Sequence, residues 1–378
     1  MDCDILIIGA GISGAGAAYA IGGRRRVIML EGEFQPGYHA TGRSAALYEP
    51  ALGNTTAQRF NAASEAFLRS PPPGFADRAL MMRRGMLMIA DAEGRPALDQ
   101  MIKLNTSLGH VVRELTAEAA IAMVPVLRRH LVHWALLAPD VMDMDVHAIH
   151  RGYLRGFASV GGKLVCNATV KRIEKRSGLW EIEAAGQTFR APIVVNAAGA
   201  WADEVARHAG LLPLGLQPKR RTVAILPAPD GIDTREWPVT GFVGEPGYVK
   251  PEAGKLLVSA GDATPAEPQD IQPEELDVAV LVDWLESKTT MSVKRVERRW
   301  AGLRTFASDD SPVLGEDPDA PGFCWLAGQG GCGIMMSESL GRSLASMLLT
   351  GELPADIRAL GIDPADIAPG RLREENFS

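Results

Sequence analysis

The chain has 378 residues, of which 46% are hydrophobic and 22% are charged, and its net charge is −7. This length predicts at least two domains, and the composition is ordinary for a soluble globular enzyme. The acidic balance argues against nucleic-acid partners, because non-specific binding to a polyanion needs a basic face.

The first strong pattern is a short apolar run followed by closely spaced glycines. The run Ile5–Ile8 predicts a buried strand, the next six residues, GAGISG, predict a turn, and residues 15–21 predict a helix. A second strand is predicted over residues 27–30, and Glu31 follows it directly. This is the order of elements that a dinucleotide-binding βαβ unit requires.

Each glycine of this motif has a physical role. Gly9 permits a tight turn, Gly11 lets a pyrophosphate approach the backbone, and Gly14 lets the helix pack close to the strand. The helix N-terminus offers N–H groups to phosphates, and the Glu31 carboxylate can accept hydrogen bonds from ribose hydroxyls. We therefore expect an ADP-containing cofactor; the alternative is a glycine-tolerant turn without a ligand.

The uncharged stretch over residues 5–23 is not expected to be a membrane span or a signal peptide. It is rich in glycine, and acids rather than a basic segment precede it. The four cysteines form no CxxC pair and have no zinc-type spacing with histidine, so we expect no metal site. These features favour a cytoplasmic location, with membrane contact only at the periphery through an electron acceptor.

Further elements follow in chain order. Helices are predicted over residues 117–123, 145–160, 273–288 and 335–349. Strands are predicted over residues 80–90 (with a kink at Gly85), 163–166, 169–175, 180–184, 193–195, 221–226, 247–259 and 323–327. The last dozen residues are charged or contain proline, and we expect fraying there.

This order predicts an α/β plus α+β fold in which two domains are interwoven. A Rossmann-type FAD-binding domain is expected over residues 1–75, 145–215 and 295–378. An antiparallel-sheet substrate-binding domain is expected over residues 76–144 and 216–294, with each boundary placed to within about ten residues.

Three later motifs carry a family resemblance. They are GYHATGRSAA at residues 37–46, VVNAAGAW at 194–201, and WAGLR at 300–304 with GQGGCGI at 328–334. Together with the opening βαβ unit they resemble the D-amino-acid oxidase superfamily of FAD-dependent oxidoreductases. Within it, the chain is similar to the branch of D-arginine dehydrogenase and other D-amino-acid dehydrogenases, and the likeness runs nearly end to end.

The resemblance implies a set of FAD-binding residues. They are Gly9, Gly11, Ile12, Ser13, Gly14, Glu31, Gly32, His39, Thr41, Gly42, Arg43, Ser44, Ala45, Ala46, Val170, Ala198, Gly199, Trp201, Gly302, Arg304, Gly328, Gly330, Gly331, Cys332, Gly333 and Ile334. The late glycine-rich loop precedes a helix, whose N-terminus can stabilise negative charge on the reduced ring. The alternative for this loop is a plain turn between strand and helix.

Some relatives bond a histidine of the 37–46 loop covalently to the flavin. The arginine-type enzymes have a similar Tyr-His motif and hold FAD non-covalently, so we expect non-covalent FAD and no bond to His39.

The resemblance also implies a carboxylate clamp made of Arg221, Arg304 and Tyr248. A guanidinium grips a carboxylate through two parallel hydrogen bonds, which suits this role. The alternative for each arginine is a structural salt bridge.

The side-chain pocket departs from that of the arginine enzyme. Gly85 stands where a glutamate faces the substrate guanidinium, Leu47 and Leu52 replace a histidine and a tyrosine, and Met335 replaces a polar residue. We therefore expect neutral, apolar D-amino acids to be preferred over cationic ones. Glu49 is a new acid in the same loop and could restore a cation site.

The expected reaction is oxidative deamination of a D-amino acid to a 2-imino acid and then a 2-keto acid, with hydride transfer to flavin N5. No histidine aligns with the reacting carbon, so no general base is assigned. Alternatives are a flavin oxidase or dehydrogenase for glycine, N-methyl amino acids or 2-hydroxy acids, and a flavin-binding protein without turnover. A tRNA-modifying relative is disfavoured by the charge, and the electron acceptor (quinone, carrier protein or oxygen) is left open.

Overall fold

The computed structural model describes residues 1–374, and its centre is a six-stranded sheet in the order β20-β21-β13-β1-β2-β9. Neighbouring strands are parallel, except that β20 is antiparallel to β21. The strands are β1 (Ile5–Ile8), β2 (Val27–Leu30), β9 (Lys163–Val165), β13 (Ile193–Asn196), β20 (Val313–Glu316) and β21 (Phe323–Ala327). With helix α1 (Ile12–Ile21) between β1 and β2, the predicted βαβ unit is confirmed.

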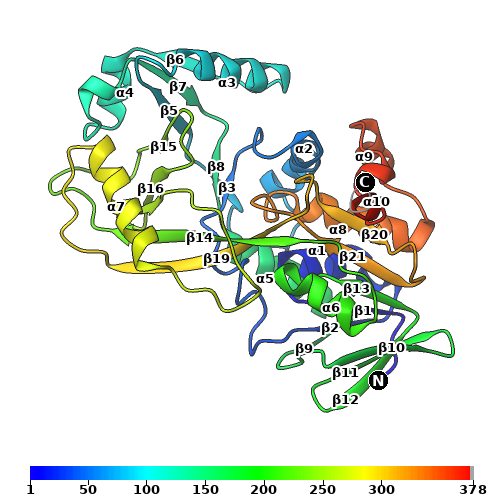
Figure 1. Cartoon of the computed structure of the whole chain (residues 1–378). Coiled ribbons are helices and arrows are strands. Elements are labelled where there is room, and N and C mark those ends of the chain that lie inside the picture. Colours follow the sequence, from blue (N-terminus) through cyan, green and yellow to red (C-terminus); the bar gives the residue numbers. More distant parts are fainter. Residues whose placement is uncertain (375–378) are drawn as a thin grey trace.

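Both faces of this sheet are covered (Figure 1). Ile5 and Ile7 of β1 belong to the core that also contains residues of helices α1, α5 (Val146–Ser159) and α8 (Ser337–Thr350). Leu6 and Ile8 face the opposite core. That core is closed by α6 (Ala202–His208) and by an antiparallel sheet of β10 (Arg172–Arg176), β11 (Leu179–Ala184) and β12 (Gln187–Ala191). Burial on both faces explains why β1 is apolar at every position.

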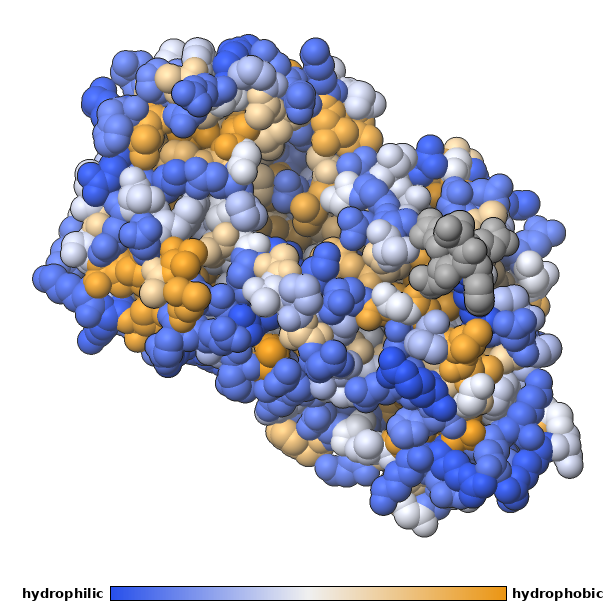
Figure 2. All heavy atoms as spheres, viewed as in Figure 1, coloured by the Kyte–Doolittle hydropathy of each residue, from blue (hydrophilic) through white to orange (hydrophobic). Residues whose placement is uncertain are grey.

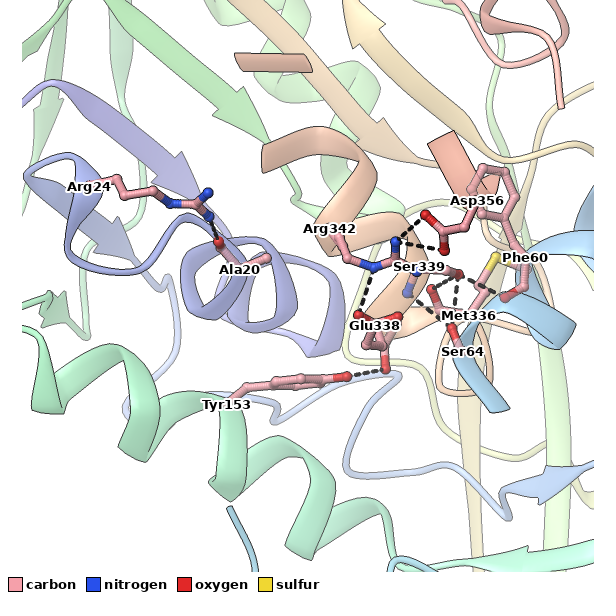
Figure 3. Close-up of polar contacts among 11 residues, drawn as sticks. Ala20, Arg24, Phe60, Ser64, Tyr153, Met336, Glu338, Ser339, Arg342 and Asp356 are labelled. Carbon is pink, nitrogen blue, oxygen red and sulfur yellow. Dashed lines mark hydrogen bonds and ion pairs between the residues drawn. The ribbon is translucent and has the colours of Figure 1, made fainter. Parts of the chain in front are cut away.

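Helices α1 and α8 cross at two glycines. A Cβ added to Gly341 would lie 2.6 Å from the carbonyl carbon of Gly16, so only glycine permits this approach. Figure 3 shows how polar side chains fix α8 from outside this crossing: Arg342 binds Glu338 and Asp356, and the Ser339 hydroxyl lies 2.8 Å from that of Ser64. Because β1 and β21 both run parallel to β13, helices α1 and α8, which follow them, begin at the same edge of the sheet.

A second, larger sheet has the order β18-β14-β17-β16-β15-β5-β7-β6, with β19 paired to the other side of β14. Its strands are β5 (Met86–Ala90), β6 (Arg113–Leu115), β7 (Trp134–Ala138), β14 (Gln217–Leu226), β15 (Val239–Phe242), β16 (Tyr248–Glu252), β17 (Lys255–Ser259), β18 (Thr264–Pro265) and β19 (Arg298–Phe306). In Figure 1, β14 and β19 extend from this sheet toward the parallel sheet. Among the described strands, β14 and β19 are the longest.

A small sheet, β3-β8-β4, lies between the two larger ones in the view of Figure 1. It contains β3 (Leu47–Tyr48), β4 (Met81–Arg83) and β8 (Met142–Met144). The other helices are α2 (Thr55–Arg69), α3 (Arg95–Ser107), α4 (Ala117–Met123), α7 (Glu275–Lys288), α9 (Ala355–Ala359) and α10 (Arg371–Glu374). Single 3₁₀ turns are η1 (Gly22–Arg24), η2 (Arg129–Leu131), η3 (Gly199–Trp201) and η4 (Pro364–Asp366).

The predicted fold class is confirmed, while the division into two domains stays an interpretation. The parallel sheet takes its strands from the three segments assigned to the FAD-binding domain. Strand β19 comes from the third of these segments, yet it pairs with β14 in the larger sheet.

The expected fraying near the C-terminus is wrong for the described part of that segment. Ile367 and Leu372 are buried in the cores on either side of the parallel sheet. The remainder of this expectation, for residues 375–378, falls outside the described residues.

One outer helix carries exposed apolar side chains. Leu276 and Val280 of α7 are 70% and 51% exposed, and Figure 2 shows a hydrophobic patch over the position of this helix. No described helix is long and apolar enough to cross a membrane.

Candidate active site

A single elongated cavity runs from the carboxyl edge of the parallel sheet to one face of the β14–β19 pair. Most of the predicted FAD-binding residues line it, although the sequence scatters them over more than 300 positions. Those lining it are Gly9, Gly11, Ile12, Ser13, Glu31, Gly32, His39, Thr41, Arg43, Ser44, Ala45, Val170, Ala198, Gly199, Trp201, Gly302, Arg304, Gly330, Gly331, Gly333 and Ile334.

The opening glycine turn leaves donors free for a phosphate group. The N–H groups of Gly11 and Ser13 have no hydrogen-bond partner among the described residues. Gly9 has a φ of 102°, and a Cβ there would lie 2.4 Å from the Ala197 carbonyl oxygen. The Ile12 N–H donates to Thr41 Oγ1 at 2.9 Å, which fixes the 37–46 loop above the turn. Free N–H groups at the start of α1 suit an anionic pyrophosphate.

Polar and aromatic side chains gather beside Glu31. Its carboxylate accepts from the N–H groups of Ala10 at 3.0 Å and Glu33 at 3.1 Å, and burial raises its pKa. His39 Nε2 lies 2.8 Å from Glu33 Oε1, and its ring is 4.5 Å from that of Trp201. His39 therefore lies on the side of the cavity where we expect the ribose.

The 37–46 loop is anchored to the larger sheet by Arg43. Its Nη1 donates to the carbonyl oxygens of Ile271 at 2.9 Å and Ala301 at 3.1 Å, and its Nη2 pairs with Asp270. The absence of a side chain at Gly302 leaves room for Arg43, whose Cβ would lie 3.4 Å from an added Cβ. The loop is thereby held between the two sheets.

Two arginines project from one face of β14 and β19. Arg221 is paired with Gly302, and Arg304 lies two residues further along β19, so both side chains are on the same face. Among the described residues neither guanidinium has a hydrogen bond or an ion pair, and the Nε of Arg221 is buried without a partner. Burial and the charge of Arg304 lower the pKa of Arg221 to about 10. An anion between them would relieve both effects.

Tyr248 lies near these arginines but does not line the main cavity. Its charge interaction with Arg221 places it close to that guanidinium. Its ring packs on an apolar cluster with Met86, Val141 and Val239, and Leu47 packs on the same cluster. The structure therefore places Leu47 and Tyr248 against the same apolar cluster.

The late glycine-rich loop closes the cavity beneath Arg304. Gly330 has a φ of 53°, and its N–H donates to the Thr305 carbonyl oxygen at 2.8 Å. A Cβ on Gly331 would lie 3.1 Å from Arg304 Nη1. The buried Nε2 of Gln329 has no partner and belongs to the same cavity wall. This unsatisfied donor fits the polar edge of a bound ring system.

Five predicted FAD-binding residues do not line the cavity. Gly14 and Gly42 shape the turns instead, because a Cβ would lie 2.0 Å from the Gly9 oxygen and 2.6 Å from the Gly37 oxygen. Gly328 turns the chain after β21 with a φ of 68°. Cys332 is buried against Leu52, with Sγ 3.9 Å from its carbonyl oxygen. Ala46 accepts a backbone hydrogen bond from Met144.

The predicted side-chain pocket is only partly assembled. Gly85 is wrong as a pocket residue: its φ is 74°, and an added Cβ would face Leu137 and Pro238. Leu52 is exposed, and Met335 is buried in the core, where its Sδ accepts from the Glu49 N–H at 3.2 Å. A one-residue displacement explains the error at Gly85, since Met86 belongs to the cluster on which Tyr248 and Leu47 pack.

Glu49 faces a second, small cavity. It is lined by Glu49, Met86, Met88, His110, Asp140 and seven further residues that include Met101 and Asn105. The Glu49 carboxylate has no hydrogen bond or ion pair among the described residues, and burial raises its pKa to about 7. This lone acid is therefore poorly solvated.

Sequence reasoning missed several residues of the main site. Glu33, Gln329 and Ile271 line the cavity, and His150 fixes the glycine turn through a 2.9 Å contact between its Nε2 and the Ala10 oxygen. His150 lies on the buried face of α5. Its position, on the buried face of an amphipathic helix, was the available signal. No group of metal-binding side chains occurs within residues 1–374.

Comparison with known proteins identifies similar chains. A family model described as FAD dependent oxidoreductase matches residues 4–347. In sequence, the chain is similar to glycine oxidase from Geobacillus kaustophilus (strain HTA426), with 25% identity over 395 residues, covering 98% of this chain and 96% of that protein.

Two solved structures share the fold over nearly the whole chain. L-proline dehydrogenase from P. horikoshii has a TM-score of 0.83 and 19% identity, covering 99% of this chain and 98% of that one. Iminodiacetate oxidase from Chelativorans sp. BNC1 has a TM-score of 0.78 and 24% identity, covering 97% and 98%.

Proposed function

Because the chain belongs to the FAD-dependent oxidoreductase family and takes FAD as its cofactor, we propose that it oxidises the carbon–nitrogen bond of a small amino carboxylate. Glycine and N-substituted glycines are the preferred class. The observation that carries this proposal is the pair Arg221 and Arg304, two guanidiniums on one strand face without an acidic partner. A structural role for either arginine would call for a carboxylate in contact with it.

The residues of the chain fit FAD at several points. The free N–H groups of the first glycine turn suit the pyrophosphate, and Glu31 suits a ribose. The donors of the late loop suit the electron-rich edge of the ring system. His39 is held by Glu33 on the ribose side, which supports non-covalent binding.

In the proposed mechanism the protein binds and orients. Arg221 and Arg304 grip the substrate carboxylate, and the Tyr248 phenol donates a further hydrogen bond to it. This fixes the α-carbon next to the cavity wall formed by Gly330 and Gly331. Bound FAD supplies the acceptor for the hydride that leaves the α-carbon. The amine enters unprotonated, having left its proton in solvent, and its lone pair forms the C=N bond that water then hydrolyses.

We favour glycine and its N-substituted derivatives over the apolar D-amino acids that the sequence predicted. Two similar proteins are named for glycine and iminodiacetate, both small amino carboxylates, and they support the alternative that the sequence left open. One observation keeps D-amino acids as a second candidate: the apolar cluster of Leu47, Met86 and Val239 beside Tyr248 offers a wall for an aliphatic substituent.

The test is anaerobic reduction of the bound flavin by a substrate panel. Glycine, N-methylglycine, iminodiacetate, L-proline, D-alanine, D-leucine and D-lactate are mixed one at a time with the purified holoenzyme, and flavin absorbance is followed. We expect the fastest bleaching with glycine or an N-substituted glycine. Faster bleaching by D-leucine would favour the second candidate, and no bleaching by any compound would refute the proposal.

The pH dependence follows from the mechanism. Since only the neutral amine reacts, the rate of flavin reduction at low substrate concentration should rise with pH through one ionisation that belongs to the substrate. Two substrates with different amine pKa values should show correspondingly displaced profiles. Identical profiles would assign the ionisation to the protein instead.

A further inference from the structure

On one side of β14, the hydrogen-bonded pairing with neighbouring strands is interrupted beside Arg221. Lys219 and Arg220 pair with β18, and residues 224–226 pair with β17, so residues 221–223 have no strand partner on that side. On the other side β19 pairs continuously from Gln217 to Ile225. Thr222 therefore directs both of its backbone groups into a gap. Unpaired backbone groups inside a protein are costly.

Two side chains fill this gap. Both carboxylate oxygens of Asp262 accept from the Thr222 N–H, at 2.8 and 2.9 Å. The Ser259 hydroxyl donates to the Thr222 carbonyl oxygen at 2.8 Å. Regular pairing of two strands uses neither of these interactions. In the gap, the two side chains take the place of the missing strand and satisfy both backbone groups of Thr222.

The same short segment also holds the Tyr248 strand. Ser259 is the strand partner of Tyr248 in the β16–β17 pair. Gly261 has a φ of 81°, and a Cβ there would lie 2.3 Å from the Pro246 oxygen, so the segment packs tightly on the residues before Tyr248. Residues 259–262 thus join the strand of Arg221 to the strand of Tyr248.

Asp262 acts on Arg221 in a second way. Its charge favours the guanidinium form of Arg221, although no ion pair joins the two side chains in the described structure. A carboxylate in direct contact with Arg221 would compete with an anionic substrate. Asp262 is held by the Thr222 N–H and forms no ion pair with Arg221, so its charge favours the guanidinium without occupying the position of a substrate carboxylate.

We propose that Asp262 is a positioning residue for substrate binding: it caps the gap at Thr222 and thereby sets the orientation of Arg221 relative to Tyr248, with Ser259 completing the brace. This inference rests on the proposed function, since it assumes that Arg221 binds the substrate carboxylate. It adds a residue outside the cavity wall to the machinery that determines substrate affinity.

The test separates the hydrogen bond from the charge. Asp262→Asn keeps an oxygen that can accept from Thr222, whereas Asp262→Ala removes it, and Ser259→Ala removes the second brace. The matched control is Asp233→Asn, which changes an exposed acid in the loop between β14 and β15. Anaerobic flavin reduction, at varied concentrations of the best substrate from the panel, gives the apparent Kd and the limiting rate for each holoenzyme.

We expect Asp262→Ala to raise the apparent Kd at least tenfold and to lower the limiting rate, because Arg221 loses its fixed orientation. Asp262→Asn should keep the Kd within threefold of wild type, which a general loss of packing would not restore. Equal values for wild type and Asp262→Ala would overturn the proposal, as would an Asn variant as impaired as the Ala variant. If no substrate reduces the wild-type flavin, the proposed function fails first, which is a distinct result.

Discussion

Arg220 and Arg221 are neighbours on β14, yet their surroundings are opposite. Arg220 points to one face of the sheet, where its side chain is 7% exposed and pairs with Glu274 and with Asp277, the latter at 2.8 Å. Arg221 points to the other face, where it meets Arg304 and no acid in contact. The charge of Arg220 is neutralised by its two acidic partners, whereas no acid in contact neutralises the charges of Arg221 and Arg304.

This difference separates a structural arginine from a binding one. A buried cation with two acids needs nothing else, whereas two partly buried cations side by side are stable only if an anion can join them. This difference can be tested by mutation, because loss of a structural arginine should lower stability and loss of a binding arginine should lower activity.

The largest expected effect is on catalysis. Arg221→Ala and Arg304→Ala each remove one fork of two charge-assisted hydrogen bonds, which is roughly 4 kcal/mol or about 1,000-fold in kcat/KM. Unfolding by urea should show no loss of stability, because each change removes a cation that has no partner. A kcat/KM within twofold of wild type in both variants would refute the clamp.

Arg220→Ala should show the converse. Removing this cation leaves Asp277 buried without its partner, and we expect a loss of about 3 kcal/mol in the free energy of unfolding. The control is Arg299→Ala, which breaks an exposed pair with Glu275 and should not change stability measurably. Equal stability of the two variants would show that Arg220 is not structural.

Glu49 extends the comparison to an acid, because its carboxylate has no hydrogen bond or ion pair among the described residues. Burial raises its pKa to about 7, so between about pH 4.5 and pH 7 the folded protein holds a proton that the unfolded chain has lost. This group therefore removes stability as the pH rises through that window. Glu49→Gln should stabilise the protein by roughly 3 kcal/mol at pH 8 and leave it unchanged at pH 4. Thermal unfolding at the two pH values decides this, and a variant less stable at pH 8 would contradict it.

The smallest effect is expected at Tyr248. Tyr248→Phe keeps the ring against Leu47 and Met86 and removes one hydrogen bond to a charged group, which is roughly 1.5 kcal/mol or about tenfold in KM. Stability should not change. A KM equal to that of wild type would remove the phenol from the clamp.

Local patterns predicted the bounds of several helices and strands well. The strands Ile5–Ile8, Val27–Leu30 and Phe323–Ala327 and the helix Ala117–Met123 have the predicted bounds, because period, capping and glycine placement are all local signals. Helix α7 begins two residues later than predicted. The strands predicted within residues 247–259 are β16 and β17, and Ala253 and Gly254 form the turn with positive φ between them.

Long-range features could not be predicted in the same way. The motif of Arg304 gave no sign that residues 298–306 form a strand against β14, and helices α2 and α3 were not predicted at all. The hydrogen bond from the Thr222 N–H to Asp262 joins residues 40 positions apart. It depends on how the strands pair, which local sequence patterns do not reveal. Gly85 was misplaced because one residue of displacement reverses the direction of a strand side chain.

The most direct measurement is acetate binding to the oxidised holoenzyme, followed by the change in flavin absorbance. Acetate has the carboxylate but no amine, so it reports the clamp without turnover. We expect a saturable change in wild type. Acetate affinity should be at least tenfold weaker in Arg221→Ala and Arg304→Ala, and within threefold of wild type in Lys219→Met, which removes a nearby cation outside the cavity. Equal acetate affinity in wild type and both arginine variants would contradict this expectation.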